Sequence, residues 1–227
     1  MAARSNQAQR RCGVIFDVDG TLVDSTYLHT LAWARTFREA GHDVETYKIH
    51  RAVGMGSDQL VPAVIGREQP GLSDKHTEHY RELGEEARAF AKVSELLRSL
   101  HGQRLQVILA TSAKPEELKR LLAKIDADDA IDRVVSSEEV STSKPAPDIF
   151  ETALEQSGLK AGQALVVGDS VWDLKAASRC GLPAVAVLCG GTSRDELEEA
   201  GAARVYEDPA HLVADLPGWT ELIQALD

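Results

Sequence analysis

The chain has few cysteines, a shortage of basic residues and no long apolar run, and each shortage excludes a class of protein. Its three cysteines are far apart in 227 residues, with a spacing that fits no zinc site and indicates reduced thiols. A formal net charge of −11 argues against nucleic acid or an anionic membrane as the main partner, since both need a basic surface. No apolar stretch approaches the roughly 20 residues that span a bilayer. We therefore expect a cytoplasmic protein with neither a nucleic-acid nor a membrane partner.

Short apolar runs recur along the chain, with helical patterns between them. The runs predict strands over residues 12–18, 105–111, 133–137, 164–169, 184–190 and 203–208. The stronger runs are nearly continuous Val, Ile, Leu and Ala, which is typical of parallel strands covered on both faces. The alternation of strands and helices predicts an α/β fold, a doubly wound parallel sheet of the Rossmann-like type. Ligands of such sheets bind beyond the carboxyl ends of the strands.

The interval between the first two predicted strands is too long for a single crossover connection. Within it, Ser25 is placed to cap a helix whose Trp33 and Phe37 share a face, and Gly41 follows that helix. We expect residues 27–90 to form a small helical cap domain above the sheet, where a lid belongs. Residues 12–26 and 91–227 would form the α/β core. The polar opening MAARSNQAQRR lacks the apolar run of a secretory signal and predicts a disordered tail over residues 1–11.

Helix signals support the predicted core. Two apolar stripes with helical spacing are Phe90, Val93, Leu97 and Leu100, and Leu118, Leu121, Leu122 and Ile125. Ser193 and Glu196 form a capping-box pattern, and Gly201 ends that helix. Pro115 and Pro147 stand where first-turn prolines are common.

Polar residues follow four of the predicted strands, and a parallel sheet would bring them to one edge. They are Asp17 and Asp19, Thr111 and Ser112, Lys144, and Asp169 with Asp173. In extended backbone, residues two apart point to the same side, so Asp17 and Asp19 can face one cavity. Like charges there raise each other's pKa, and a cation, a shared proton or a reaction must compensate. A calcium loop is excluded, because its fifth, sixth and twelfth positions would be Thr21, Leu22 and Leu28.

Each of these residue types suits phosphoryl transfer. A carboxylate such as Asp17 can attack phosphorus, provided that the negative charge is compensated. Asp17 and Asp169, with a backbone carbonyl, suit Mg²⁺, and Lys144 adds a positive charge for the phosphoryl oxygens. Asp19 can protonate the leaving oxygen and then deprotonate a water. Asp173, one helical turn after Asp169, could orient Lys144 or a metal-bound water.

The remaining candidates bind the phosphate or the rest of the substrate. Thr111 offers a hydroxyl, and the amides of Ser112 and Ala113 lie at a predicted helix N-terminus, which favours anions. Gly20 lets the backbone approach the phosphate closely. In the predicted cap, His29 could reach the substrate or simply be a solvated or capping histidine. Arg51 could bind a carboxylate or a second phosphate, or form an ordinary surface ion pair.

With these motifs in order, the chain resembles the haloacid dehalogenase superfamily of phosphohydrolases over residues 12–227. DVDGTLVDS resembles the family's first motif, LATS its second, SKPAPDIF its third and VVGDSVWDLKAA its fourth. The resemblance implies Asp17 as nucleophile, Asp19 as general acid/base and Mg²⁺ as cofactor. It implies Asp17, Asp169 and the backbone carbonyl of Asp19 as metal ligands, and Asp173 is a further candidate at the metal site. The position of the insert resembles the small-cap subgroup that includes phosphoglycolate phosphatase-like and β-phosphoglucomutase-like enzymes.

Rival functions remain beside a phosphatase that acts on a small phosphorylated metabolite as a monomer or weak homodimer. A β-phosphoglucomutase-like mutase is disfavoured, because those relatives should carry a lysine before the cap glycine and here Val53 precedes Gly54. His29, however, matches a histidine that they carry. Dehalogenation fits poorly, since dehalogenating relatives lack an acid like Asp19. A non-catalytic phosphate-binding module would be expected to lose a charged member of the motifs, and none is lost.

Overall fold

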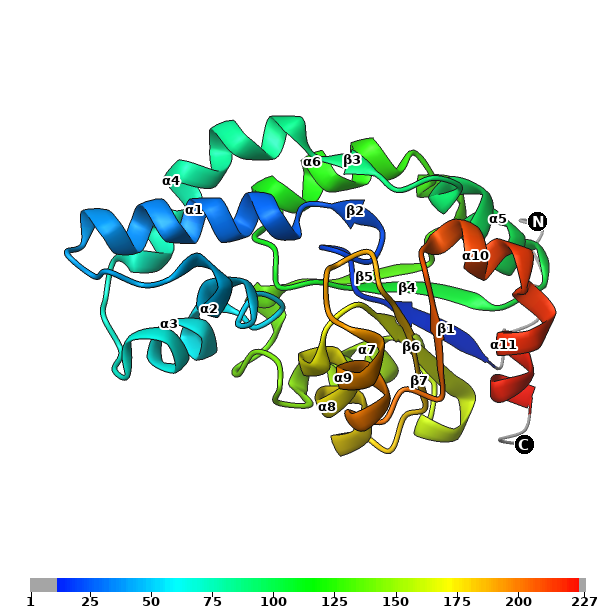
Figure 1. Cartoon of the computed structure of the whole chain (residues 1–227). Helices are drawn as coiled ribbons and strands as arrows, with labels where there is room; N and C mark the ends of the chain where they lie inside the picture. The colour runs from blue at the N-terminus through cyan, green and yellow to red at the C-terminus, as the bar shows by residue number, and fades with distance from the viewer. Residues whose placement is uncertain (1–11, 225–227) are drawn as a thin grey trace, which may run out of the picture.

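A six-stranded, wholly parallel sheet organises the chain in the computed structural model, which describes residues 12–224 (Figure 1). The strands are β1 (Gly13–Phe16), β4 (Gln106–Ala110), β5 (Arg133–Val135), β6 (Ala164–Gly168), β7 (Ala184–Val187) and β8 (Arg204–Tyr206). Their order in the sheet is β5-β4-β1-β6-β7-β8. This confirms the predicted α/β class and all six predicted strands. The tail predicted over residues 1–11 lies outside the described residues.

The central strand β1 is buried on both faces and divides the core in two. Successive side chains of a strand point to opposite faces, so Val14 and Phe16 join one apolar cluster and Ile15 joins the other. Ile15 pairs with Ile108 of β4 on one side and with Val166 of β6 on the other. Complete burial of all four β1 residues explains the continuous apolar run in the sequence.

Helices cover both faces of the sheet. Residues of α5 (Val93–Gly102), α6 (Pro115–Ile125), α10 (Pro209–Ala214) and α11 (Leu216–Gln224) contribute to the cluster around Phe16. Residues of α7 (Asp148–Ser157), α8 (Val171–Arg179) and α9 (Arg194–Glu199) contribute to the cluster around Ile15. Short 3₁₀ turns lie at Gly84–Glu86, Asp128–Ala130, Ser137–Glu139 and Ala161–Gln163. Helices on both faces are the doubly wound arrangement that the sequence predicts.

Most of the helix signals are found where the sequence places them. Ser193 and Glu196 form the capping box of α9, and Pro115 is the first residue of α6. Phe90, by contrast, precedes α5, which begins at Val93. Ser25 stands at the N-cap of the first helix but makes no capping bond, because its hydroxyl donates to Asp19 Oδ1 at 2.6 Å.

Four helices between β1 and β4 share an apolar cluster of their own. They are α1 (Thr26–Glu39), α2 (Thr46–His50), α3 (Ser57–Ile65) and α4 (Leu72–Leu83). Trp33, Phe37, Ile49, Leu60 and Leu72 form the centre of this cluster. Figure 1 shows these helices at one end of the molecule, beyond the edge where β1 and β6 end.

A two-stranded antiparallel ribbon, absent from the sequence prediction, connects these helices to the sheet. It joins β2 (Val23–Asp24) to β3 (Arg88–Ala89), with Val23 opposite Ala89. The chain therefore enters and leaves the four-helix segment at adjacent points.

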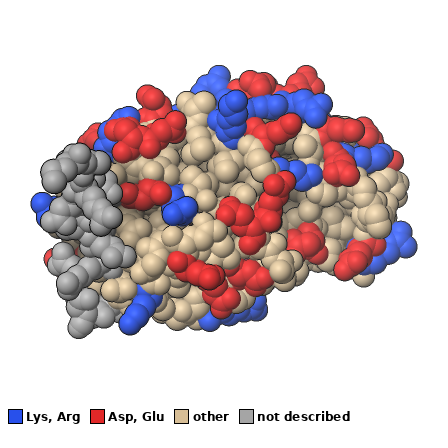
Figure 2. Space-filling model, turned by 180° about the vertical axis from the view of Figure 1, so that it is seen from behind, with Lys and Arg blue, Asp and Glu red and all other residues tan. Residues whose placement is uncertain are grey.

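Helix length and surface charge are two further features of the described residues. Within residues 12–224 the structure contains no helix with the length and apolarity required for a membrane span. On the face drawn in Figure 2, acidic side chains form several groups and basic side chains are scattered between them. That face offers no continuous basic surface, as expected for a net charge of −11.

Candidate active site

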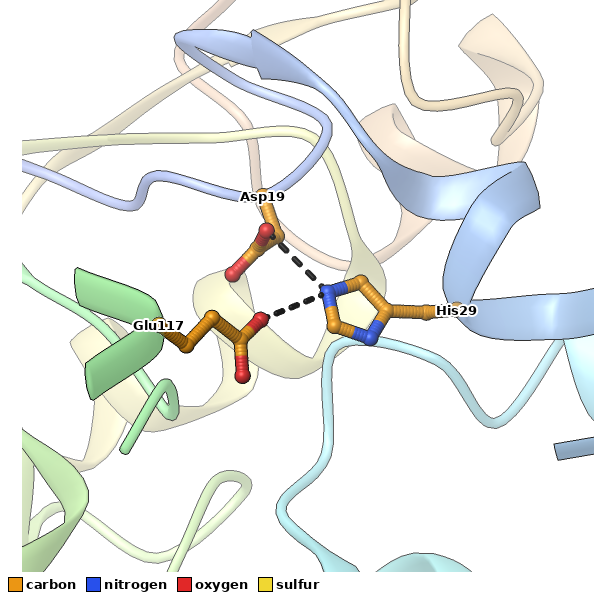
Figure 3. A group of neighbouring side chains, drawn as sticks. All are labelled: Asp19, His29 and Glu117. Carbon is orange, nitrogen blue, oxygen red and sulfur yellow. Dashed lines mark hydrogen bonds and ion pairs between the residues drawn. The ribbon is translucent and has the colours of Figure 1, made fainter. Parts of the chain in front are cut away.

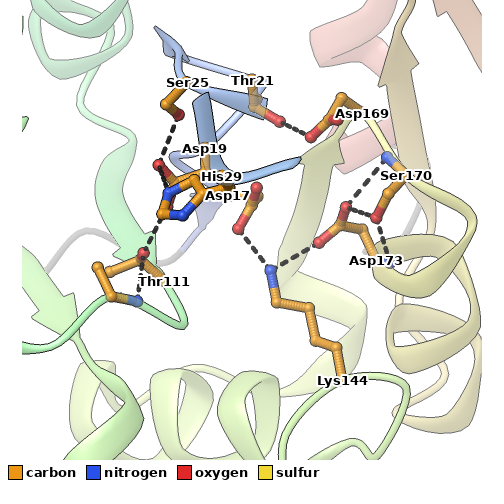
Figure 4. Close-up of polar contacts among 11 residues, drawn as sticks. Asp17, Asp19, Thr21, Ser25, His29, Thr111, Lys144, Asp169, Ser170 and Asp173 are labelled. Carbon is orange, nitrogen blue, oxygen red and sulfur yellow. Dashed lines mark hydrogen bonds and ion pairs between the residues drawn. The ribbon is translucent and has the colours of Figure 1, made fainter. Parts of the chain in front are cut away.

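The acidic residues predicted at the strand ends meet at one edge of the sheet (Figure 4). Asp17 follows β1, and Asp169 follows the neighbouring strand β6. The backbone N–H of Asp17 donates to Val167 O at 2.9 Å, which locks the end of β1 to β6. Asp173 lies in the first turn of α8, directly after Asp169 in the chain. One carboxylate oxygen from each of Asp17, Asp169 and Asp173 lies within 4.8 Å of the other two.

Lys144 enters this acidic group from the loop before α7. Only 1 % of the residue is exposed, and its Nζ donates to Asp17 and, at 2.8 Å, to Asp173 Oδ1. The other oxygen of Asp173 accepts from the backbone N–H of Ser170 at 3.1 Å, so Asp173 caps α8 and holds Lys144 at once. Burial lowers the pKa of Lys144, but the two carboxylates outweigh it and raise that pKa above its ordinary value. Lys144 therefore stays charged.

The single positive charge of Lys144 does not offset the negative charges of three buried carboxylates. Burial raises the pKa of Asp17 to about 7, with Asp173 and Asp19 adding repulsion and Lys144 opposing it. Burial and the charges of Asp173 and Asp17 raise the pKa of Asp169 well above its ordinary value. Carboxylates in this condition are stabilised by a divalent cation.

The space beside Asp169 also suits a small hard cation. Carboxylate and carbonyl oxygens are the donors that Mg²⁺ prefers, and the group contains no thiol or imidazole. Two glycines give the backbone close access to Asp169, because a Cβ on Gly190 or Gly20 would lie 1.7 or 2.5 Å from its Oδ2. Thr21 Oγ1 donates to the other oxygen at 3.0 Å and orients the carboxylate. The residues present therefore fit Mg²⁺.

Asp19 belongs to a second polar group, with His29 and Glu117 (Figure 3), and this group lies beside the first (Figure 4). Its Oδ1 accepts from Ser25 Oγ at 2.6 Å and lies 3.2 Å from His29 Nε2. Thr111 Oγ1 reaches its Oδ2 at 3.5 Å. Burial favours a raised pKa for Asp19, but His29 and Ser25 outweigh burial and hold that pKa below its ordinary value. Ser25 and Thr111 thus fix the orientation of the Asp19 carboxylate.

His29 lies between two carboxylates. Its Nε2 is 3.2 Å from both Asp19 Oδ1 and Glu117 Oε1, and its ring stacks on Tyr80 at a centroid distance of 3.8 Å. Burial lowers the pKa of His29, but the two carboxylates outweigh it and raise that pKa to about 10. His29 Nδ1 faces His76 Nε2 at 3.3 Å, and burial together with the His29 charge lowers the pKa of His76 well below its ordinary value. These shifts favour an ionised Asp19 carboxylate beside a protonated His29 imidazole.

The loop after β4 lies against the same space. Thr111 is fully buried, and its Oγ1 accepts from the backbone N–H of Ala113 at 3.0 Å. Ser112 and Ala113 line the cavity just before Lys114, the N-cap of α6, and the Ala113 N–H already donates to Thr111. Gly20 has φ +82°, a left-handed conformation that favours glycine.

A cavity of about 130 Å³ lies over Asp17 and Asp19, between the sheet edge and the helices α1–α4. Core residues on its wall include Ser112 and Lys144, and residues of the helical segment include His29 and Trp33. A substrate bound at Asp17 would occupy this cavity and would be covered by the helical segment.

Arg51, a candidate from the sequence, does not line this cavity. Its side chain is 64 % exposed and forms an ion pair with Glu196 of α9. Its backbone carbonyl accepts from Trp172 Nε1 at 3.1 Å. Of the two sequence interpretations of Arg51, these contacts match the ordinary surface ion pair.

Sequence reasoning missed Glu117, His76 and Tyr80. Glu117 stands in the first turn of α6, six residues after Thr111, so helix phase from the LATS motif could have pointed to it. His76 and Tyr80 are four residues apart on α4 and share a face, but nothing in the sequence indicates that this face meets His29.

Comparisons with known proteins agree with this geometry. A family model described as haloacid dehalogenase-like hydrolase matches residues 14–187. The fructose-1-phosphate phosphatase YqaB of Escherichia coli is 28 % identical over 185 residues, covering 79 % of this chain and 97 % of that protein. The phosphoglycolate phosphatase of Rhodospirillum rubrum is 30 % identical over 213 residues, with 88 % of each chain covered.

Solved structures share the fold. A hydrolase from Pseudomonas syringae superposes with a TM-score of 0.86 at 34 % identity, covering 91 % of this chain and 98 % of that one. A β-phosphoglucomutase from Clostridium difficile superposes with a TM-score of 0.80 at 17 % identity, covering 95 % and 98 %. The second likeness concerns the fold alone.

Proposed function

Because the chain belongs to the haloacid dehalogenase-like hydrolases, we propose that it is a Mg²⁺-dependent phosphatase that hydrolyses a small phosphomonoester through a phosphoryl group carried on Asp17. The observation that supports this most strongly is the buried group of Asp17, Asp169, Asp173 and Lys144 at the ends of β1 and β6. Burying three carboxylates around one lysine costs free energy, and groups of this kind are typical of functional sites.

In the first half of the reaction, an oxygen of Asp17 forms a bond to phosphorus and the bond from phosphorus to the leaving oxygen breaks. Lys144, held by Asp173, offsets negative charge on the phosphoryl oxygens as the bond forms. Asp19 donates a proton to the leaving oxygen. That proton is available within the Asp19–His29 pair, because the imidazole that carries it lies 3.2 Å from Asp19 Oδ1.

In the second half, Asp19 takes a proton from a water, which attacks phosphorus and releases inorganic phosphate from Asp17. Thr111 and Ser25 hold the Asp19 carboxylate in place for both transfers. The carboxylates of Asp17 and Asp169 and the backbone carbonyl of Asp19 would hold Mg²⁺, which would supply positive charge to offset the repulsion between an anionic phosphoryl group and an anionic nucleophile.

The helices α1–α4 form the cap domain of this proposal, over residues 27–90, and residues 12–26 and 91–227 form the core. The separate apolar cluster around Trp33 and Phe37 supports this division, as does the ribbon of β2 and β3 that joins the two parts. The three cysteines, few and far apart in the sequence, support a reducing, cytoplasmic location. A cap that closes the site from within the chain suits a monomer or weak homodimer.

A sugar-phosphate mutase is the rival enzyme. Val53 and Gly54 line the cavity, so the position before the cap glycine faces the substrate space without offering a lysine. This favours the phosphatase, since Val53 supplies no positive charge to a bisphosphate intermediate.

Release of inorganic phosphate tests the proposal. Hydrolysis of p-nitrophenyl phosphate and of a panel of phosphorylated metabolites should require Mg²⁺, and Asp17→Asn should abolish it. β-Glucose 1-phosphate with a bisphosphate primer should yield phosphate; formation of the 6-phosphate isomer would favour the mutase. No Mg²⁺-dependent turnover of any compound would favour a binding role.

A further inference from the structure

The charge of the cavity wall carries an inference about the substrate, which rests on the proposed phosphatase function. Among the described residues that line the cavity, three are carboxylates: Asp17, Asp19 and Glu117. The first two belong to the reaction, whereas Glu117 comes from α6 and faces His29. Glu117 thus adds a negative charge to the part of the wall that lies beyond the phosphoryl group.

The cations of the wall are already engaged. Lys144 is buried between Asp17 and Asp173. The Nζ of Lys114 lies 3.3 Å from Asp74 Oδ1 and 3.1 Å from Thr77 Oγ1, with 43 % of the side chain exposed.

The wall also lacks an arginine, and of its two histidines, His29 and His76, the first is outnumbered by carboxylates. No arginine occurs among the described lining residues, and Arg51 is paired with Glu196 outside the cavity. His29 lies between two carboxylates, which outnumber it even when its imidazole is charged. Among the described lining residues, a second anionic group on a substrate would therefore meet Glu117, and the one partly exposed cation there, Lys114, is already paired with Asp74.

The rest of the wall suits hydroxyl groups and carbon. Ser57, Ser73 and Thr77 contribute hydroxyls from the helices α3 and α4, and Ser112 and Ser143 contribute them from the core. Apolar surface comes from Trp33, Val53, Met55 and Leu60. Hydroxyls combined with apolar side chains offer hydrogen bonds and contact surface to an uncharged, hydroxylated group.

We propose that the natural substrate has an uncharged, hydroxylated leaving group, and that Glu117 selects against leaving groups that carry a carboxylate or a second phosphate. The two curated relatives differ on this point, since one is named for fructose 1-phosphate and the other for phosphoglycolate. On this property the present chain resembles the first.

Substrate pairs of the same skeleton test the proposal. Glycerol 3-phosphate carries a hydroxymethyl group where 3-phosphoglycerate carries a carboxylate. The same difference separates 2-hydroxyethyl phosphate from phosphoglycolate. In each pair, kcat/KM for the uncharged member should exceed that for the carboxylate by about tenfold or more, the effect of one like charge at partly screened distance. Glu117→Gln should reduce this ratio about fivefold. The ratio is insensitive to a general loss of activity through His29, because such a loss affects both members of a pair.

Glu116→Gln is the matched control. Glu116 is the neighbouring residue in the first turn of α6, exposed and outside the cavity wall, so this change removes the same charge and should leave the ratio unaltered. Preference of the native protein for the carboxylate substrates would overturn the proposal. The proposal would also be overturned if Glu117→Gln and Glu116→Gln gave the same ratio of kcat/KM values for the two substrates of a pair. A selective loss of 3-phosphoglycerate turnover in Lys114→Ala would overturn it as well. Failure of every phosphate ester, p-nitrophenyl phosphate included, would instead contradict the phosphatase function.

Discussion

Substitution of Gly190 by alanine tests the proposed metal site without changing any charged residue. Gly190 is buried in the loop after β7, and a Cβ there would lie 1.7 Å from Asp169 Oδ2 and 2.3 Å from its Cγ. Real Cβ contacts are essentially never shorter than 3.0 Å, so the carboxylate must move by at least about 1.3 Å. Gly190 has no positive φ, so alanine brings crowding without backbone strain. The change therefore acts on the position of Asp169.

The expected loss follows from that displacement. A misplacement of about 1 Å in a catalytic arrangement costs on the order of 100-fold in rate, and disturbing what orients a metal ligand costs about 10–100-fold in metal affinity. Gly190→Ala should thus raise the Mg²⁺ concentration for half-maximal activity at least about tenfold. At saturating Mg²⁺, its kcat on p-nitrophenyl phosphate should stay well below that of the native protein. Circular dichroism should show an unchanged fold.

Gly102→Ala provides the matched control. Gly102 lies at the exposed end of α5, where a Cβ meets nothing within 4 Å, and alanine favours a helix there. This variant should keep native Mg²⁺ dependence and activity. If Gly190→Ala behaves like Gly102→Ala, then Asp169 does not hold the ion and the reasoning from its crowded surroundings is wrong.

Three further predictions concern the buried charges and the cap. Lys144→Met should abolish turnover and lower the free energy of unfolding in urea by about 3–5 kcal/mol, because it leaves Asp17 and Asp173 buried without their cation. Adding Asp173→Asn to this variant should recover part of the free energy of unfolding but no activity. Burial raises the pKa of Asp17 from 3.8 to about 7, so its protonated form stabilises the metal-free fold at low pH and this contribution is lost as the pH rises from about 4 to 7. Mg²⁺ should therefore raise Tm more at pH 8 than at pH 5. An equal increase in Tm at the two pH values would refute the assignment. Arg51→Ala removes an exposed pair with Glu196, so it should cost at most about 1 kcal/mol and leave KM within about twofold; a large rise in KM would place Arg51 at the substrate.

The sheet and the residues at its edge could be predicted from the sequence because both are local signals. Continuous apolar runs indicate strands buried on both faces, and Asp17 and Asp169 stand directly after two of them. Parallel pairing then brings the strand ends together without any knowledge of the side chains. The prediction of an α/β sheet with a helical insert depends on nothing finer than this.

Features that depend on contacts across the insert could not be predicted. The two-residue strands of the ribbon are too short to leave a periodic pattern, and their partners are far apart in sequence. Ser25 has the residue type of a cap, yet its hydroxyl turns to Asp19, because the helix start lies beside the catalytic loop. Helix phase could have indicated Glu117, but its contact with His29 and the position of Arg51 become visible only once α6 and α2 are placed relative to the cavity.

The central claim is that the buried carboxylates serve phosphoryl transfer to Asp17, and trapping the phosphoryl group tests it most directly. The protein with Mg²⁺ and p-nitrophenyl phosphate would be quenched in acid within one turnover and reduced with borohydride, which converts an aspartyl phosphate to homoserine. Mass spectrometry of the peptide around Asp17 should then show homoserine at that position, and none at Asp19 or in protein treated without substrate. Rapid turnover with an unmodified Asp17 would contradict the account.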